Sequence, residues 1–178
     1  MRAKKNLTTA LALLVVSMLI GGFNQSYASG SGDKYQDAQV GLDYQLYKPT
    51  YTKDLILNKF QILSCGKYES WVASNYGEDR GFQLLQNLKS HPCSNAGMGV
   101  KVKKVKIKNF NVEIVVYCDV TKKREWANCS LKDLPNYGGH AVFTSEASKI
   151  YKASSIEIIT SGLDYKELVK IISNLKKV

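Results

Sequence analysis

The sequence predicts an α+β domain: a curved antiparallel sheet of about six or seven strands, with a C-terminal amphipathic helix packed on one face. Two observations lead to this fold class. Short runs of alternating apolar and polar residues, separated by turn-forming residues, fill the region from residue 55 to 160. Helical spacing of apolar residues is clearest at the end of the chain, in Leu168, Ile171, Ile172 and Leu175. Since this helix face must be buried, we expect it to pack on the sheet.

The first 28 residues have the pattern of a secretory signal peptide. Three basic residues precede an apolar run from residue 10 to 20, and the segment ends with Ser26, Tyr27 and Ala28. The apolar run is about half the roughly 20 residues that a membrane-spanning helix needs. We therefore expect cleavage after Ala28 and a secreted or extracytoplasmic protein that begins at Ser29.

Beyond the leader, the composition predicts a flexible linker or short helix over residues 29–39 and a single α+β domain over residues 40–178. The run S-G-S-G-D at 29–33 is typical of flexible linkers. An extended arm is expected before Pro49, because the residue that precedes a proline is disfavoured in the helical region.

Strand patterns follow at 55–63, 68–76, 82–88 and 102–118, with shorter ones at 141–144, 148–152 and 156–160. The turn residues at 77–81 predict a hairpin between the second and third strands. A second hairpin is expected within 102–118, with its turn at 109–111 because asparagine tolerates a positive φ angle. Residues 119–139 interrupt the pattern and predict an irregular excursion.

The C-terminal helix has the clearest local signals in the chain. Asp164 and Glu167 have the spacing of a capping box, and Leu163 and Leu168 have that of a hydrophobic staple. Lys176 and Lys177 would complement the helix dipole at its end.

Four cysteines in an exported chain indicate two disulfides rather than free thiols or metal ligands. Three pairings are possible. The hairpin at 68–89 would bring the chain at Cys93 back to Cys65, so we predict the pairs Cys65–Cys93 and Cys118–Cys129. A zinc site would require paired cysteines or close histidines, which are missing, so no metal and no cofactor are expected.

Several segments of the chain resemble the domain of unknown function 4367 family. They are the proline-containing start at 46–51, the F-Q-L-L-Q run at 82–86, and the end from Ile159 to Ile172. The resemblance implies an exported or membrane-tethered α+β domain of the kind that accompanies envelope sensing or regulatory proteins, and it assigns no functional residue. The four cysteines and the excursion at 119–139 depart from the family pattern.

The net charge is +10 for the whole chain and +7 once the leader is removed, since the leader holds three of the 25 basic residues and none of the 15 acidic ones. Outside a cell, this charge favours an anionic envelope polymer, a lipid headgroup or a partner protein over nucleic acid. Two basic stretches are the candidate binding residues: Lys104, Lys106 and Lys108 in one strand, and Lys122, Lys123, Arg124 and Trp126 in the excursion. The alternatives are that the lysines protect a sheet edge from pairing and that Trp126 closes a small local core.

No motif of a known catalytic class is present in the sequence. We therefore expect a non-enzymatic exported domain that binds an envelope component or a partner protein through a basic face. The alternative is a small secreted hydrolase whose site would be assembled from distant residues such as His140 and Asp119.

Overall fold

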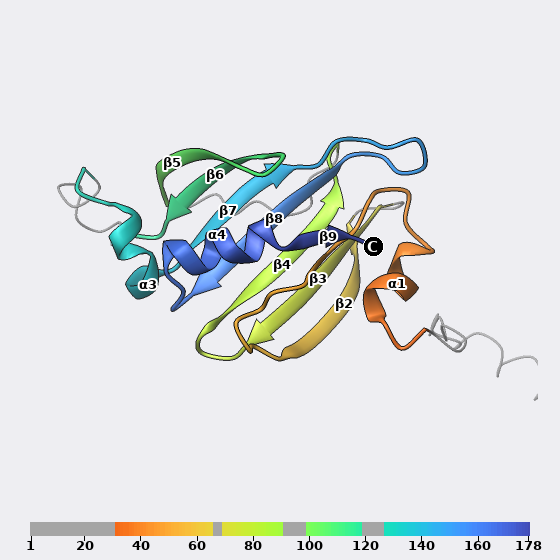
Figure 1. Ribbon diagram of the computed structural model, residues 1–178, viewed down its shortest axis with the longest axis horizontal. Helices are drawn as coiled ribbons and strands as arrows, with labels where there is room; N and C mark the ends of the chain where they lie inside the picture. The colour runs from red at the N-terminus through yellow and green to blue at the C-terminus, as the bar shows by residue number, and fades with distance from the viewer. Residues whose placement is uncertain (1–30, 66–68, 91–98, 119–126) are drawn as a thin grey trace, which may run out of the picture. The chain divides into compact units, whose positions relative to one another are not determined.

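A seven-stranded antiparallel sheet forms the centre of the computed structural model, in the spatial order β2-β3-β4-β8-β7-β6-β5 (Figure 1). The structure describes residues 31–65, 69–90, 99–118 and 127–178. The strands of this sheet are β2 (Leu57–Cys65), β3 (Glu69–Gly77), β4 (Gly81–Leu88), β5 (Val100–Ile107), β6 (Phe110–Val116), β7 (Gly139–Thr144) and β8 (Ser154–Ser161).

Short elements accompany the sheet. The chain begins with α1 (Lys34–Gln39), and η2 (Leu131–Asp133) and α3 (Leu134–Tyr137) precede β7. Near the end, α4 (Tyr165–Ser173) is followed by β9 (Leu175–Lys177), which pairs with β1 (Tyr47–Pro49) in a separate two-stranded antiparallel sheet. Among the described residues, no helix is long and apolar enough to cross a membrane.

One hydrophobic cluster joins α4 to the central strands. Leu168, Ile171 and Ile172 of α4 are fully buried and belong to the same cluster as Leu84 of β4 and Ile158 of β8. In Figure 1, α4 lies across one face of the sheet, which we call the helix face. Side chains alternate along a strand, so the residues between these apolar positions point to the opposite face.

The start of α4 has the predicted capping box. The N–H of Glu167 donates to the Asp164 carboxylate at 2.8 Å, and the N–H of Asp164 donates to the Glu167 carboxylate at 3.0 Å. The Arg80 guanidinium also donates to both Glu167 oxygens, at 2.7 and 2.9 Å. Leu163 and Leu168, the expected staple, are both fully buried. Sequence signals that act within one turn of helix are therefore sufficient to place this helix start.

The helix ends earlier than its apolar spacing suggested. Ser173 is the last residue of α4, and Leu175 begins β9. Tyr47 and Pro49 of β1 face Lys177 and Leu175 of β9 in this pairing. Leu175 is still buried in the core, so the spacing identified a buried residue but assigned it to the wrong element.

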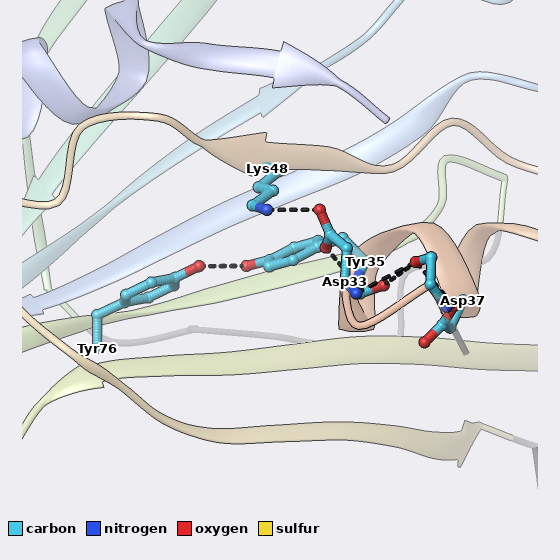
Figure 2. Close-up of polar contacts among 6 residues, drawn as sticks. Asp33, Tyr35, Asp37, Lys48 and Tyr76 are labelled. Carbon is cyan, nitrogen blue, oxygen red and sulfur yellow. Dashed lines mark hydrogen bonds and ion pairs between the residues drawn. The ribbon is translucent and has the colours of Figure 1, made fainter. Parts of the chain in front are cut away.

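The N-terminal segment is attached to the domain by polar contacts. Asp33 caps α1 by accepting from the N–H of Tyr35 at 3.0 Å, and it pairs with Lys48 at 2.6 Å (Figure 2). This pairing lowers the pKa of Asp33. Ser31 donates to Asp37 as well, at 2.9 Å. The compact unit begins at Ser31 and includes α1, a short helix within the segment 29–39 for which a flexible linker or short helix was expected.

A tyrosine of α1 reaches the helix face of the sheet. The hydroxyl of Tyr35 lies 2.9 Å from the hydroxyl of Tyr76 (Figure 2) and 2.6 Å from Ser74 Oγ, and all three side chains are buried. Burial raises the pKa of Tyr35. Each hydroxyl of the trio has a partner, which offsets the cost of removing these groups from water.

Glutamine side chains hold the extended arm onto the same face. Gln86 of β4 accepts from the N–H of Tyr47 at 2.7 Å and donates to the Tyr47 carbonyl at 2.9 Å. Gln39 of α1 accepts from the N–H of Leu46 at 2.7 Å. These contacts satisfy backbone groups that β1, only three residues long, leaves unpaired.

Two further strand predictions differ from the structure. Residues 148–152 form a loop rather than a strand, and the regular strand starts at Ser154. An isolated bridge pairs Lys152 of this loop with Tyr44. The β5–β6 turn consists of Lys108 and Asn109, and the residue with positive φ is Lys108, at 51°. Phe110 is buried and begins β6, so the turn falls one position before the predicted 109–111.

Candidate functional site

The lysine-rich strand forms one edge of the central sheet. β5 ends the strand order and pairs with β6, and with no other strand in the part of the chain that the structure describes. Lys104 and Lys106 are two residues apart and both are exposed, whereas Val105 between them is half-buried and packs against the core. We call Lys101, Lys104, Lys106 and Lys108 the basic edge.

The basic edge places two of its three predicted lysines on one face. Strand geometry sets the Cα atoms of Lys104 and Lys106 about 7 Å apart, with their side chains on the opposite face. Lys108 is also exposed, but it lies in the turn after β5 rather than in the strand. The predicted row is therefore a pair in the strand with a third cation at its end.

One carboxylate lies within the basic edge. Glu113 of β6 pairs in register with Lys104, and its oxygens lie 2.6 Å from Lys101 Nζ and 3.8 Å from Lys104 Nζ. Lys106 faces Asn111 across the ladder and has no ion pair among the described residues. Four cations against one carboxylate leave this edge positive. A shallow depression on the opposite face is lined by Lys104, Lys106, Asn111 and Glu113, with Val105 and Val112.

Sequence reasoning placed Lys101 in the lysine-rich strand but left it out of the candidate row, and it missed Glu113 as part of this surface. Lys101 lies before an irregularity in the β5–β6 register, which changes the alternation of the strand at that point. Glu113 could have been found from the hairpin, because a turn of two residues at 108–109 fixes Lys104 opposite Glu113. The one-residue error in the turn hid this pair.

The second basic stretch cannot be placed in the fold. Lys122, Lys123, Arg124 and Trp126 lie outside the described residues, so their part in a binding surface stays a prediction. Lys103, the other lysine of β5, lies over the ring of Tyr165 at 4.7 Å from its centroid. Its ammonium is thus directed to α4 rather than to the row formed by Lys104 and Lys106.

A disulfide joins Cys118 to Cys129, as predicted from the sequence, and closes the start of the excursion. Cys93 lies outside the described residues, so the pair Cys65–Cys93 stays a prediction. The two sulfurs of Cys118 and Cys129 lie within 4.8 Å of an Asp133 carboxylate oxygen. Because both sulfurs are in the disulfide, this group offers no thiolate to a metal ion. Asp133 instead accepts from the N–H and hydroxyl of Ser130, at 2.8 and 3.0 Å.

His140 lies on the opposite face of β7, in a buried position. Its Nδ1 is 2.9 Å from the hydroxyl of Tyr117, and 6% of its surface is exposed. Burial lowers the pKa of His140, although the charge of Glu113 acts in the other direction. Burial, together with the charge of Glu157, raises the pKa of Tyr117 to about 12. His140 and Tyr117 are therefore a neutral imidazole and a protonated phenol, and they form a polar contact within the fold.

The alternative hydrolase needs a second group beside His140. Asp119, the carboxylate suggested with it, lies outside the described residues. The contact with Tyr117 supplies no activated nucleophile, since a phenol with a raised pKa loses its proton less readily than a free tyrosine. The hydrolase stays a prediction that the described geometry does not strengthen.

A scan against protein-family models found no match, and searches of curated proteins and of solved structures found none either. The resemblance to the domain of unknown function 4367 family therefore stays a prediction.

Proposed function

We propose that this chain is a non-enzymatic exported domain that binds an anionic partner of the cell envelope through its basic edge. The observation that carries the proposal is the exposed pair Lys104 and Lys106 on the edge strand of the sheet, with 77% of the Lys104 side chain accessible. Buried charges would require partners within the fold, whereas exposed cations in a row are available to a ligand. The proposal also includes Lys108 at the end of β5 and, as predicted binding residues outside the described part of the chain, Lys122, Lys123, Arg124 and Trp126.

The supporting fold is a curved sheet with the C-terminal helix packed on one face. The hydrophobic cluster shared by α4, β4 and β8 supports this arrangement. It leaves the side chains of Lys104 and Lys106 on the face away from α4, where a large ligand can approach them. A rigid sheet also fixes the spacing of the two lysines, which reduces the entropy lost when both contact one ligand.

Two features support export. The N-terminal residues have the pattern of a cleaved leader, and the Cys118–Cys129 disulfide is typical of an oxidising compartment. Anionic polymers and lipid headgroups are abundant at the surfaces such a protein meets, and attraction to them weakens as salt rises.

The test is retention of the protein beginning at Ser29 on its own cell-envelope fractions across a salt series. We expect retention that fades between low and high salt, and a loss of about tenfold in affinity when Lys104, Lys106 and Lys108 are all changed to glutamine. The matched control changes Lys149, Lys166 and Lys176, three exposed lysines outside β5 and its turn, and removes the same charge.

Equal loss in both triple variants would show that net charge alone drives retention, and would contradict a site at the basic edge. Unchanged retention in the β5 variant would contradict the proposal directly.

A further inference from the structure

The backbone of β5 offers hydrogen-bonding groups at the same positions as its exposed lysines. The turn of two residues makes Ile107 and Phe110 the closing pair of the hairpin. In such a hairpin the closing pair exchanges both backbone bonds, and pairs then alternate between bonded and non-bonded along the ladder. Lys104 and Lys106 fall at non-bonded positions with respect to β6. Their N–H and C=O groups therefore point away from the sheet, toward its edge.

The two faces of β5 differ in polarity. Lys104 and Lys106 extend from the opposite face, whereas Val105 and Ile107 contact the hydrophobic core. A strand laid against this edge would meet cations on one face at every second residue and the partly buried Val105 on the other. An extended segment that alternates acidic and apolar residues matches both faces, because its own side chains also alternate with a period of two.

The β5–β6 pair already places a carboxylate opposite a lysine of β5, on the inner side of the edge strand. Glu113 of β6 is directly opposite Lys104, and a carboxylate oxygen lies 3.8 Å from its Nζ. A carboxylate on an added strand would take the equivalent position on the other side. Opposite charges facing each other across a ladder stabilise the pair, and like charges destabilise it.

The same charges disfavour a second copy of this chain as the partner. Two β5 strands placed edge to edge would bring lysines against lysines. The strand at the other edge, β2, contains Lys59 and no acidic residue over Leu57–Cys65, so it offers no complement either. Lysines on an edge strand thus exclude neutral and basic strands while they leave the edge open to an acidic one.

From this geometry we infer that the anionic partner is an extended polypeptide segment with acidic residues at every second position, which adds to β5 as an eighth strand of the sheet. The inference rests on the proposed function, since it names the partner class for the basic edge. Backbone bonds at Lys104 and Lys106 would supply affinity, and the acidic side chains would supply selection.

The experiment compares three peptides of the sequence Glu-Val-Glu-Val-Glu, acetylated and amidated, by isothermal titration calorimetry with the protein beginning at Ser29. One is unmodified, one is N-methylated at its first two glutamates, and one at its two valines. The three peptides have the same charge. We infer antiparallel addition, as in every other pair of this sheet. In that orientation the glutamates opposite Lys104 and Lys106 would use their N–H groups in the ladder, whereas the valine N–H groups would point to solvent.

We expect methylation of the glutamates to weaken binding by about tenfold or more, and methylation of the valines to change it by less than about threefold. Binding of the unmodified peptide should also fall by about tenfold in the protein with Lys104→Gln and Lys106→Gln. Lys149→Gln with Lys176→Gln is the matched control, and it should leave binding unchanged.

Equal binding of all three peptides would overturn strand addition and leave electrostatic binding at the basic edge intact. Failure of all three to bind, while retention on envelope fractions still depends on Lys104 and Lys106, would also overturn it and point to a non-peptide anion. If no peptide binds and retention on envelope fractions does not depend on Lys104 and Lys106 either, both the inference and the proposed function are wrong.

Discussion

The contacts beneath α1 and the basic edge use polar side chains in opposite ways. Beneath α1, the hydroxyls of Tyr35, Ser74 and Tyr76 are buried and lie within hydrogen-bonding distance of one another. At the edge, Lys104 and Lys106 are exposed, and one carboxylate, Glu113, serves the cations of β5. Polar groups that are paired and buried stabilise the fold, whereas polar groups left in solvent can serve a partner without a cost to folding.

Lys48 and Lys104 differ in the same way: one is paired within the fold and the other is largely exposed. Lys48 Nζ lies 2.6 Å from Asp33, a contact that attaches the start of α1 to β1. Lys104 Nζ lies 3.8 Å from Glu113, which is at the limit of an ion pair, and its side chain is more exposed than that of Lys48. The comparison predicts that changes on the helix face affect stability and that changes at the basic edge affect binding.

The largest expected effect comes from Ile171→Asp. Ile171 is fully buried in the cluster shared with the sheet, so an aspartate there would be a buried charge without a partner. We expect a loss of about 3 to 5 kcal/mol in the free energy of unfolding, measured by chemical denaturation. Lys166→Asp, at an exposed position of the same helix, is the control. An unchanged unfolding midpoint for Ile171→Asp would refute packing of α4 on the sheet.

A smaller effect is expected from Tyr35→Phe, which removes one hydroxyl from the buried trio. Ser74 and Tyr76 would each lose a partner, and we expect a loss of about 1 to 3 kcal/mol in the free energy of unfolding. Tyr137→Phe is the matched control, because half of that side chain is exposed. If the two variants unfold at the same denaturant concentration, the hydroxyl contacts beneath α1 contribute nothing to stability.

Much of the sheet could be predicted from sequence because its signals are local. The turn at 77–81, the capping box of Asp164 and Glu167, and the pair Cys118–Cys129 each depend on residues close together in the chain. Alternation also located the β5–β6 hairpin. The turn of this hairpin was misplaced because the positive φ was assigned to the region of Asn109, whereas Lys108 adopts it. Burial of Phe110 fixes the β5–β6 register.

Long-range contacts could not be predicted in the same way. The β1–β9 pair joins strands of three residues from opposite ends of the chain, too short for a periodic pattern. Tyr35 follows a sequence typical of a linker, and its partners Ser74 and Tyr76 lie about 40 residues away. At the candidate site, the lysine row was visible in the sequence, but its edge position depends on the strand order and its outward backbone depends on the β5–β6 register.

An intermediate effect on pH dependence is expected at His140, on the opposite face. Burial lowers its pKa in the folded state, so the unfolded chain binds a proton at His140 more readily. Stability should therefore rise with pH through the range between the folded and unfolded pKa values and fall as pH drops below about 6.5. In His140→Gln the free energy of unfolding should depend less steeply on pH between pH 5 and 7. The resulting change in the free energy of unfolding at pH 5 should be smaller than the loss expected for Tyr35→Phe. Equal slopes for variant and parent would show that the folded state does not favour the neutral imidazole.

The smallest expected effect on stability is that of Lys104→Gln combined with Lys106→Gln. Both side chains are exposed and Lys106 has no ion pair among the described residues, so the free energy of unfolding should change by no more than about 0.5 kcal/mol. The same double variant should lose salt-sensitive retention on envelope fractions. Lys48→Gln should show the reverse, with a small loss of stability and unchanged retention, since Lys48 pairs with Asp33. A stability loss above about 1 kcal/mol at Lys104 and Lys106, with retention intact, would mean that these lysines serve the sheet rather than a partner.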